Sequence, residues 1–174
     1  MTTRIFLFHP DIHSGSIVNR VLAKKAQEKG IEVRDEYSLY PDFRIDAKAE
    51  QEILEDTDRI VLQFPMYWYS TPALLKEWLD KVLVHGWAYG STGKALVGKE
   101  MALAFTQGAK AEDYTREGRF HATNEELLKP LETAAYYVGL KFLPLFVVSG
   151  TLNISQEELD KAAQRYADYL VKED

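Results

Sequence analysis

The sequence contains no cysteine, and this absence excludes several kinds of chemistry. Without cysteine, the protein has no disulfide, no catalytic thiolate and no iron–sulfur or cysteine-bound metal site. No apolar stretch reaches the roughly 18 residues that a membrane helix requires. The first apolar run is also too short for a signal peptide. We therefore expect a cytoplasmic protein.

The chain also lacks an excess of positive charge, because its net charge is −6 at pH 7. This balance argues against a general affinity for nucleic acid or for an anionic membrane. It does not exclude a small anionic ligand, which backbone dipoles can bind inside an acidic protein. No linker, repeat or low-complexity segment divides the 174 residues, so we expect one domain over residues 1–174.

Apolar runs typical of strands alternate with segments of helical periodicity. The predicted strands are residues 4–8, 31–36, 59–64, 101–105 and 142–148, and the predicted helices are residues 17–29, 46–54, 72–84, 124–138 and 156–172. Capping-box patterns begin the last two helices. Pro72 suits a first helical position, and Pro130 should kink its helix or mark the true start. The alternation predicts an α/β fold with an open parallel sheet that helices cover on both faces.

Ligands bind such sheets beyond the carboxyl ends of the strands, so the loops after the strands are the candidate site. After the first strand come His9 and then Ser14, Gly15 and Ser16, which open a helix on whose first turn Asn19 lies. Free N–H groups at a helix start, hydroxyls and a glycine are typical of a phosphate site. Alternatively, one of the serines is simply a helix cap.

The loop after the third strand, in "QFPMYWYSTPALL" (residues 63–75), carries three consecutive aromatic rings. The fourth strand is followed by "TQGAK" (residues 106–110), in which Gly108 permits close approach of a ligand to the backbone. A flat aromatic ligand with a phosphate tail would suit all three loops, and flavin mononucleotide (FMN) fits that description. The G-x-G-x-x-G fingerprint of dinucleotide folds is absent after the first strand. Local packing of the aromatic rings is the alternative.

These motifs resemble those of the flavodoxin-like NAD(P)H:quinone oxidoreductases, and most closely their small bacterial branch. That branch includes general stress NAD(P)H oxidoreductases and the ancillary flavoproteins of potassium-efflux antiporters. The resemblance covers nearly the whole chain, and it includes "HP" followed by S-x-x-N (residues 16–19), "LYPDF", "FPMYWYSTPALLKEWLDKVL", "HGWAYG" and "GK" before the fourth strand. It implies a flavodoxin-like doubly wound five-stranded parallel sheet and a bound flavin.

The resemblance also implies which residues bind the flavin. They come from the three loops and are His9, Ser14, Ser16, Val18, Asn19, Pro65, Met66, Tyr67, Trp68, Tyr69, Thr106, Gln107, Gly108 and Ala109. The family usually has TTGG after the fourth strand, from which Gln107 and Ala109 depart. The first loop is one residue longer than in close relatives.

In the larger quinone reductases, a tyrosine and a histidine on the following loop assist proton transfer. Here Tyr114 matches the family's distance from Thr106, while His121 is displaced by one residue. A histidine can share a proton near neutral pH, which suits reduction of a quinone oxygen. The other interpretation is that both are ordinary polar residues on a loop.

The resemblance permits two main functions. The first is an enzyme that moves hydride from NAD(P)H through flavin to a quinone or similar aromatic acceptor. The second is a regulatory subunit that docks on a membrane transporter. A pure electron carrier is less consistent with the sequence, since the T-x-T-G-x-T loop of flavodoxins is missing.

A homodimer built near "HGWAYG" (residues 85–90) is implied by the resemblance. The chain lacks the C-terminal extension of the large FAD-binding relatives, which favours FMN over FAD. The choice between NADPH and NADH stays open at this point, although Lys110, Arg116 and Arg119 could meet a 2′-phosphate.

Overall fold

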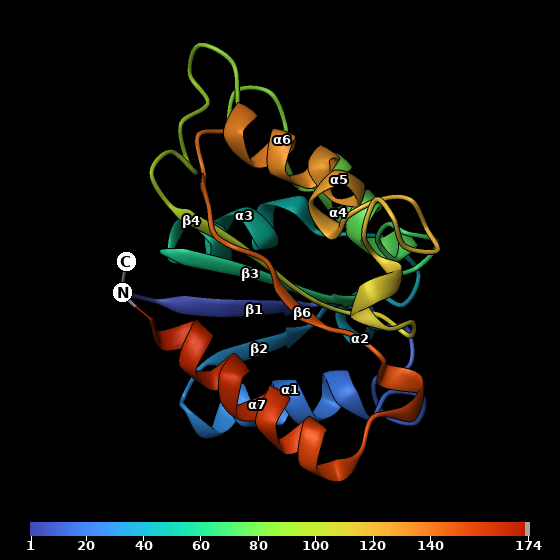
Figure 1. The fold of residues 1–174 in the computed structure, drawn as a ribbon. Coiled ribbons are helices and arrows are strands. Elements are labelled where there is room, and N and C mark those ends of the chain that lie inside the picture. Colours follow the sequence, from blue (N-terminus) through green and yellow to red (C-terminus); the bar gives the residue numbers. More distant parts are fainter. Residues whose placement is uncertain (173–174) are drawn as a thin grey trace.

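A parallel sheet lies at the centre of the protein, with helices on both faces (Figure 1). The structure is a computed structural model that describes residues 1–172. The sheet has the order β2-β1-β3-β4-β5, and β6 pairs with β4 as well. The strands are β1 (Thr3–Leu7), β2 (Glu32–Asp35), β3 (Arg59–Pro65), β4 (Glu100–Thr106), β5 (Lys141–Phe142) and β6 (Phe146–Val148). This is the doubly wound flavodoxin-like arrangement that the sequence predicts.

The helices form two layers. On one face, α1 (Val18–Glu28) packs beside α7 (Gln156–Val171). On the other face lie α3 (Ala47–Glu55), α4 (Ala73–Val82) and α6 (Lys129–Tyr137). The short elements are α2 (Glu36–Leu39), α5 (Asn124–Leu127) and two 3-10 turns, η1 (Ala111–Asp113) and η2 (Thr151–Asn153). Each layer therefore buries its own side of the sheet.

Two predicted elements are interrupted at prolines. The strand predicted at residues 142–148 is divided into β5 and β6, and Pro144 lies in the gap between them. A proline has no N–H group to donate to the strand ladder. The helix predicted at residues 124–138 is divided into α5 and α6, and Pro130 lies in the first turn of α6. The expectation that Pro130 kinks the helix or restarts it is thus confirmed.

The starts of the helices follow the predicted signals in part. Both predicted capping boxes are present, at the starts of α5 and α7. Pro72 is the N-cap of α4 and not its first helical residue, so that prediction was wrong by one position. The helix α2 was not predicted. Its cap is Asp35, which accepts a hydrogen bond from the Ser38 N–H and ends β2 one residue before the predicted boundary.

Apolar side chains fill both sides of the sheet. Phe6, Trp78 and Phe105 belong to the core beneath α3, α4 and α6, while Leu22 and Val61 belong to the core beneath α1 and α7. No helix within residues 1–172 has the length and apolar character needed to cross a membrane.

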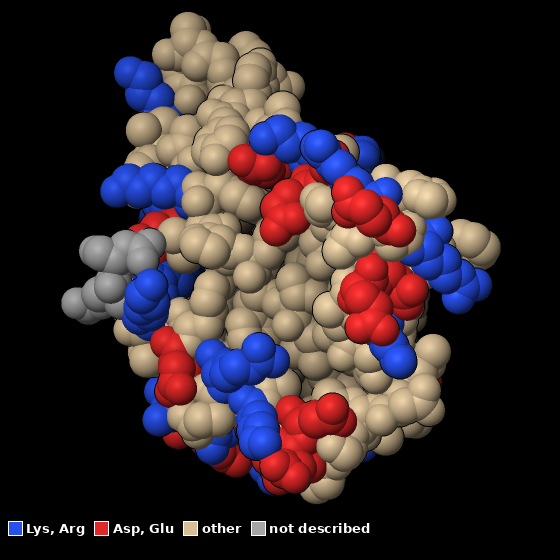
Figure 2. All heavy atoms as spheres, in the orientation of Figure 1, with Lys and Arg blue, Asp and Glu red and all other residues tan. Residues whose placement is uncertain are grey.

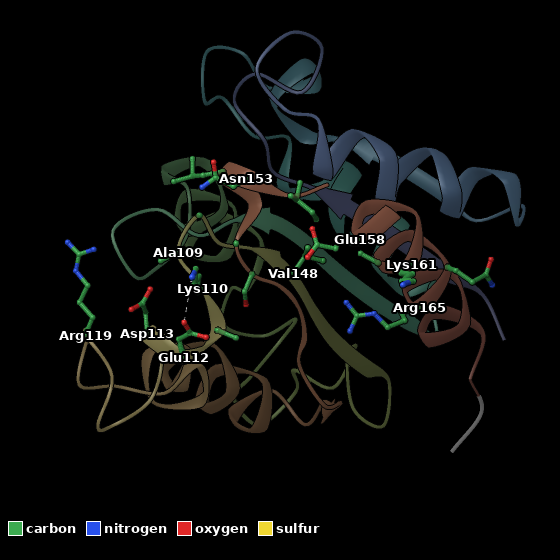
Figure 3. A pocket seen from close by; sticks show the side chains of 18 residues that line it. Ala109, Lys110, Glu112, Asp113, Arg119, Val148, Asn153, Glu158, Lys161 and Arg165 are labelled. Carbon is green, nitrogen blue, oxygen red and sulfur yellow. Dashed lines mark ion pairs between the residues drawn. The ribbon is translucent and has the colours of Figure 1, made fainter. Parts of the chain in front are cut away.

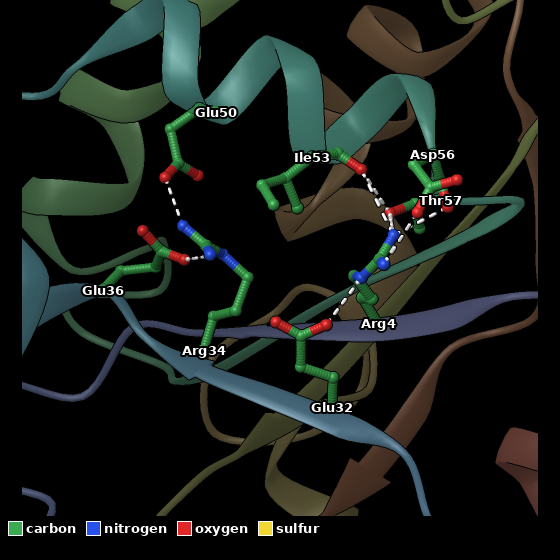
Figure 4. A network of polar contacts seen from close by, with 8 residues as sticks. All are labelled: Arg4, Glu32, Arg34, Glu36, Glu50, Ile53, Asp56 and Thr57. Carbon is green, nitrogen blue, oxygen red and sulfur yellow. Dashed lines mark hydrogen bonds and ion pairs between the residues drawn. The ribbon is translucent and has the colours of Figure 1, made fainter.

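One polar cluster is buried in the α3 and α4 layer (Figure 4). The Glu36 and Glu50 carboxylates are both 0% exposed, and the Arg34 guanidinium lies between them. Glu50 also accepts hydrogen bonds from the Tyr40 hydroxyl at 2.7 Å and the Trp78 indole N–H at 2.9 Å. Glu36 Oε2 has no partner among residues 1–172. Burial, reinforced by the charge of Glu50, raises the pKa of Glu36 to about 8.

This raised pKa predicts a pH dependence of stability. In the unfolded chain Glu36 loses its proton near pH 4.5, whereas the folded protein holds the proton until about pH 8. The folded state therefore binds more protons between these values, and the free energy of unfolding falls as pH rises through this window. We expect Glu36→Gln to gain on the order of 3 kcal/mol relative to the natural protein between pH 5 and pH 8.

Urea denaturation at several pH values measures this difference. Glu32→Gln is a matched control, because it changes an exposed carboxylate on β2, the strand that directly precedes Glu36 in the chain. The control should keep the pH dependence of the natural protein. An equal pH dependence in Glu36→Gln and the natural protein would show that Glu36 does not titrate in this window.

Candidate functional site

The carboxyl ends of β1, β3 and β4 meet at one edge of the sheet, because all three strands are parallel. The chain order reverses between β1 and β3, since β1 has β2 on one side and β3 on the other. Doubly wound sheets bind ligands at such a switch point. The loops after these three strands are those that the sequence analysis selected.

His9 follows β1 and is buried. The Asp11 N–H donates to His9 Nδ1 at 3.0 Å, so the neutral ring carries its proton on Nε2. Burial lowers the pKa of His9, while the carboxylates of Asp11 and Asp35 act in the opposite direction. His9 is therefore a neutral N–H donor at the start of this loop.

The first turn of α1 leaves several donors free. The N-cap residue is Ile17, and no side chain caps the helix, so neither serine is the cap considered in the sequence analysis. The N–H groups of residues 17–20 have no acceptor within residues 1–172. Ser16 is only 6% exposed, yet its hydroxyl makes no hydrogen bond to the described residues. Buried donors without acceptors at a helix start form a site for an anion.

The other predicted residues of this loop are already engaged. The Ser14 hydroxyl donates to the Asp11 carboxylate, and this bond lowers the pKa of Asp11. Val18 packs its side chain into the core beneath α1 and α7, so only its N–H group is free for a ligand. Ser16 is therefore the serine of this loop whose hydroxyl is free.

Asn19 belongs to a buried chain of hydrogen bonds. Its Nδ2 donates to Thr106 Oγ1 at 2.8 Å, and Gln63 Nε2 donates to Asn19 Oδ1 at 3.2 Å. The Tyr166 hydroxyl in turn donates to Gln63 Oε1 at 2.9 Å. All four side chains are buried. The Asn19 amide thus joins the first loop to the end of β4.

Gln63 and Tyr166 are not among the residues predicted for the site. The available signal was Gln63 itself, an uncharged polar residue inside the apolar run "RIVLQF". A polar side chain in a strand covered on both faces needs a buried partner. Its partner Tyr166 lies 103 positions away in α7, so the pairing depends on the fold.

The aromatic loop after β3 is a tight turn in a strained conformation. Tyr67 and Ser70 exchange backbone hydrogen bonds of 3.1 and 3.0 Å around Trp68 and Tyr69. Trp68 has φ of 48° and Tyr69 has φ of 61°, which is a type I′ pattern. That turn normally takes glycine or asparagine, and bulky residues rarely adopt positive φ.

The same turn has an exposed aromatic side chain and backbone N–H groups that are unpaired within the described residues. Trp68 is 92% exposed, although large apolar side chains are normally buried. The N–H groups of Trp68 and Tyr69 make no hydrogen bond to any of residues 1–172. Backbone strain of this kind is often retained at functional sites. The turn therefore offers an aromatic ring and free donors together.

The loop after β4 is fixed to both of its neighbours. The Met66 N–H donates to the Thr106 carbonyl oxygen at 2.8 Å, and the Gln107 N–H donates to the Val148 carbonyl oxygen at 2.9 Å. The Gly150 N–H donates to the Ala109 carbonyl oxygen at 2.7 Å. These bonds hold residues 106–109 between the aromatic loop and the end of β6.

Two side-chain features of this loop bear on a ligand. Gln107 is buried, its Nε2 donates to Ser149 Oγ at 2.8 Å, and its Oε1 has no partner within residues 1–172. A Cβ added at Gly108 would lie 3.2 Å from the Leu152 side chain. Glycine therefore fits between this loop and the exposed Leu152 without crowding. Gln107 is thus tied to Ser149, directly after β6.

Tyr114 and His121 lie in different environments. Tyr114 is 8% exposed, and burial raises the pKa of its hydroxyl, with Tyr69 adding to the effect. The Phe120 ring packs between Tyr69 and Tyr114, and its centroid lies 5.0 Å from the Tyr69 centroid and 4.8 Å from the Tyr114 centroid. His121 is exposed and has φ of 53°. The structure thus brings Tyr114 to the aromatic loop and leaves His121 at the surface.

Phe120 was not selected from the sequence. It occupies the position next to the displaced histidine, and its role depends on the spatial approach of two loops that are more than 40 residues apart in the chain. The aromatic composition of the segment gave no information on that approach.

Comparison with known proteins agrees with this geometry. A protein family described as having a flavodoxin-like fold matches residues 1–170. The chain belongs to this family. It is 48% identical to an uncharacterized NAD(P)H oxidoreductase, YrkL, of Bacillus subtilis (strain 168), over 99% of both chains. It is 42% identical to the glutathione-regulated potassium-efflux system ancillary protein KefF of Salmonella schwarzengrund (strain CVM19633), over 96% of this chain and 94% of KefF.

A solved structure extends the comparison to a ligand. General stress protein 14 of Treponema denticola, crystallised in complex with FMN, superposes with a TM-score of 0.93. It is 39% identical, and the match covers 98% of each chain. The resemblance to the NAD(P)H oxidoreductase family that the sequence motifs indicate is confirmed by these relatives.

The strained turn makes a prediction about stability. Positive φ costs an L-residue about 1 kcal/mol, whereas glycine adopts it freely. We expect Trp68→Gly to be more stable than Trp68→Ala by up to about 1 kcal/mol, because both lose the exposed ring but only glycine relieves the backbone. Urea denaturation of the two variants measures the difference. A loss of more than about 2 kcal/mol in both variants would instead show that the ring packs as part of the core.

Proposed function

We propose that the protein is a flavin-dependent NAD(P)H oxidoreductase that binds FMN and reduces a quinone or similar aromatic acceptor. The observation that carries this proposal is the placement of an exposed, strained aromatic turn and an uncapped helix start on two loops joined through Thr106. The family membership, the NAD(P)H oxidoreductase relative and the FMN complex of a relative support it.

The start of α1 suits the FMN phosphate. The free N–H groups of residues 17–20, the Ser16 hydroxyl and the Nε2–H of His9 are all neutral donors. Together with the positive end of the helix dipole they can satisfy a phosphate dianion. A dianion beside His9 would favour its charged form and oppose the effect of burial on its pKa. Ser14 would join only if its hydroxyl leaves Asp11.

The aromatic turn and the loop after β4 suit the ring system. In this arrangement Trp68 and Tyr69 supply free N–H groups to the polar edge of the ring, and Pro65, Met66 and Tyr67 support the turn. Residues 106–109 form the opposite wall, and Gly108 places no side chain there. When bound, flavin supplies the hydride-accepting chemistry, and the protein holds and shields it.

Tyr114 is the better-placed proton donor to the acceptor. Its pKa is raised, so it keeps its proton throughout the neutral range. The Phe120 ring packs between the rings of Tyr69 and Tyr114, so Tyr114 lies near the aromatic turn. His121 is retained as a second candidate, since catalytic hydrogen bonds often form only with the substrate in place.

A homodimer forms part of the proposal. A groove of about 310 Å³ lies between α4 and α6, and Tyr137 on its rim is 70% exposed. Exposed apolar surface of this kind is typical of protein interfaces. The loop 85–90 lies beside it, with Tyr89 packed 5.4 Å from Tyr137. A second copy of the chain would cover these rings. We also propose that the protein acts in the cytoplasm, as its sequence composition favours.

A regulatory role is the second candidate. The 42% identity to KefF, an ancillary protein of a potassium-efflux system, is the observation that favours it. In that role the protein would dock on a membrane transporter and could still carry out the redox reaction. Co-purification with a transporter from its own cells would support this role.

The first test is a visible absorption spectrum of the protein after loading with FMN and removal of free flavin. We expect a retained flavin band that NADPH bleaches without oxygen and that a quinone restores. Trp68→Gly should bind FMN more weakly while remaining folded, which separates ligand binding from stability. Retained flavin that neither NADPH nor NADH bleaches would favour the regulatory role. Absence of retained FMN or FAD would refute the flavin proposal.

A pair of variants tests the proton donor. We expect Tyr114→Phe to slow reduction of the acceptor by about tenfold, because one hydrogen bond to the acceptor is lost. Reduction of the flavin by NADPH should be unchanged, so stopped-flow measurement of the two half-reactions separates the effects. His121→Ala should change either rate by less than about twofold. The opposite ranking of the two variants would assign the role to His121.

A further inference from the structure

A groove runs from the loop after β4 to α7. It has a volume of about 1060 Å³, which is large for a small-molecule site. Gly108 and Ala109 line one end, and Lys161, Ala162 and Arg165 of α7 line the other. Figure 2 shows this face as a hollow with cationic side chains along part of its rim. The groove therefore begins at the proposed flavin wall and leads away from it.

Arg165 is the best-defined cation in the groove. Its guanidinium lies over the Phe146 ring, 6.0 Å from the centroid, and the Phe146 ring packs in turn on Tyr166 at 4.8 Å. Arg165 makes no ion pair with a carboxylate within residues 1–172. In Figure 3 its side chain extends from α7 along the groove. A guanidinium next to an aromatic ring and without a carboxylate partner has its N–H groups free for a phosphate.

The charges of the groove differ from those of the whole chain. Its lining contains four cationic and three carboxylate side chains, a net charge of +1, whereas the chain carries −6. Glu112 lies 3.8 Å from Lys110, so these two charges offset each other, and Glu158 belongs to the capping box of α7. The groove thus offers a local excess of positive charge in an acidic protein.

FMN does not account for this groove. Its phosphate is assigned to the start of α1, beyond β1, whereas the groove lies on the other side of the site, beside β6 and α7. A nicotinamide that reaches the flavin must leave the rest of its dinucleotide outside the ring site. The groove is large enough for the adenosine half of the dinucleotide, and it runs from Gly108 to Lys161 and Arg165.

We propose that this groove binds the adenosine half of NADPH and that Arg165 contacts the 2′-phosphate, which makes the protein selective for NADPH over NADH. The inference rests on the proposed function, since it names the hydride donor of that reaction. Lys161 lies one turn before Arg165 and pairs with Glu157, so it contributes less. Arg119 lies on the opposite wall, over the Phe120 ring, and is a secondary cation.

The test is isothermal titration of the FMN-loaded protein with 2′,5′-ADP and with 5′-ADP at fixed ionic strength. We expect 2′,5′-ADP to bind about tenfold more tightly, because the 2′-phosphate forms charged hydrogen bonds. Arg165→Gln should remove this difference. It should weaken the binding of 2′,5′-ADP about tenfold and leave the affinity for 5′-ADP unchanged. The same variant should lower kcat/KM for NADPH and not for NADH.

Two controls make the result specific. Arg44→Gln removes the same charge from an exposed residue outside the groove, and it should leave both affinities unchanged. Arg165→Lys keeps the charge but loses the planar guanidinium, so its affinity for 2′,5′-ADP should lie between those of the natural protein and Arg165→Gln. The inference would be overturned if the natural protein bound the two nucleotides equally well. It would also be overturned if Arg44→Gln weakened 2′,5′-ADP binding as much as Arg165→Gln does.

The titration also separates this inference from the proposed function. Titration of the unloaded protein reports on the groove even if no flavin is retained. A protein that retains FMN and is reduced equally well by NADPH and NADH would keep the proposed function and lose the inference. A protein that retains no flavin yet prefers 2′,5′-ADP in an Arg165-dependent way would keep the phosphate site and lose the proposed function.

Discussion

The buried hydrogen-bond chain that ends on Thr106 determines how the site is assembled. Thr106 accepts from the Asn19 amide through its hydroxyl and from the Met66 N–H through its carbonyl oxygen. One residue at the end of β4 therefore fixes the loops after β1 and β3. Asn19 and Thr106 are buried, and an unpaired buried polar group costs about 1–3 kcal/mol. The arrangement of the three loops is thus tied to the stability of the core, since Gln63 and Tyr166 complete the same chain.

This coupling explains how a strained turn can persist. Trp68 adopts positive φ at a cost that contacts of its own side chain do not offset, because it is 92% exposed. The turn is held from both ends, by the Met66 bond to β4 and by the paired bonds between Tyr67 and Ser70. The packed scaffold carries the strain, and the exposed ring is free for a ligand. A flexible loop would have to order these residues on binding, at an entropic cost of about 1–2 kcal/mol per residue.

The sequence predicted the fold well, because apolar runs and helical periodicity depend mainly on local spacing. The two divided elements required the positions of Pro130 and Pro144, and only the first of these was recognised as a possible break. The site was predictable as a set of loops, since parallel strands must end at one edge. The pairing of Gln63 with Tyr166 was not predictable, because it joins distant elements whose register depends on the whole sheet. Nor was the packing of Phe120 against Tyr69, which depends on how the segment after β4 folds back.

The two proposed phosphate sites differ in the kind of donor that they offer. At the start of α1 the donors are N–H groups, a hydroxyl and a neutral imidazole, so the binding energy comes from oriented dipoles. Such dipoles are fixed by the fold, and salt screens them little because they are partly buried. In the groove beside α7 the donor is a charged guanidinium open to solvent, whose attraction weakens with ionic strength. The buried dipolar site suits a resident cofactor, and the screened cationic site suits a substrate that must leave in every cycle. A net charge of −6 is therefore compatible with both proposed sites, because each depends on local donors and not on the charge of the whole chain.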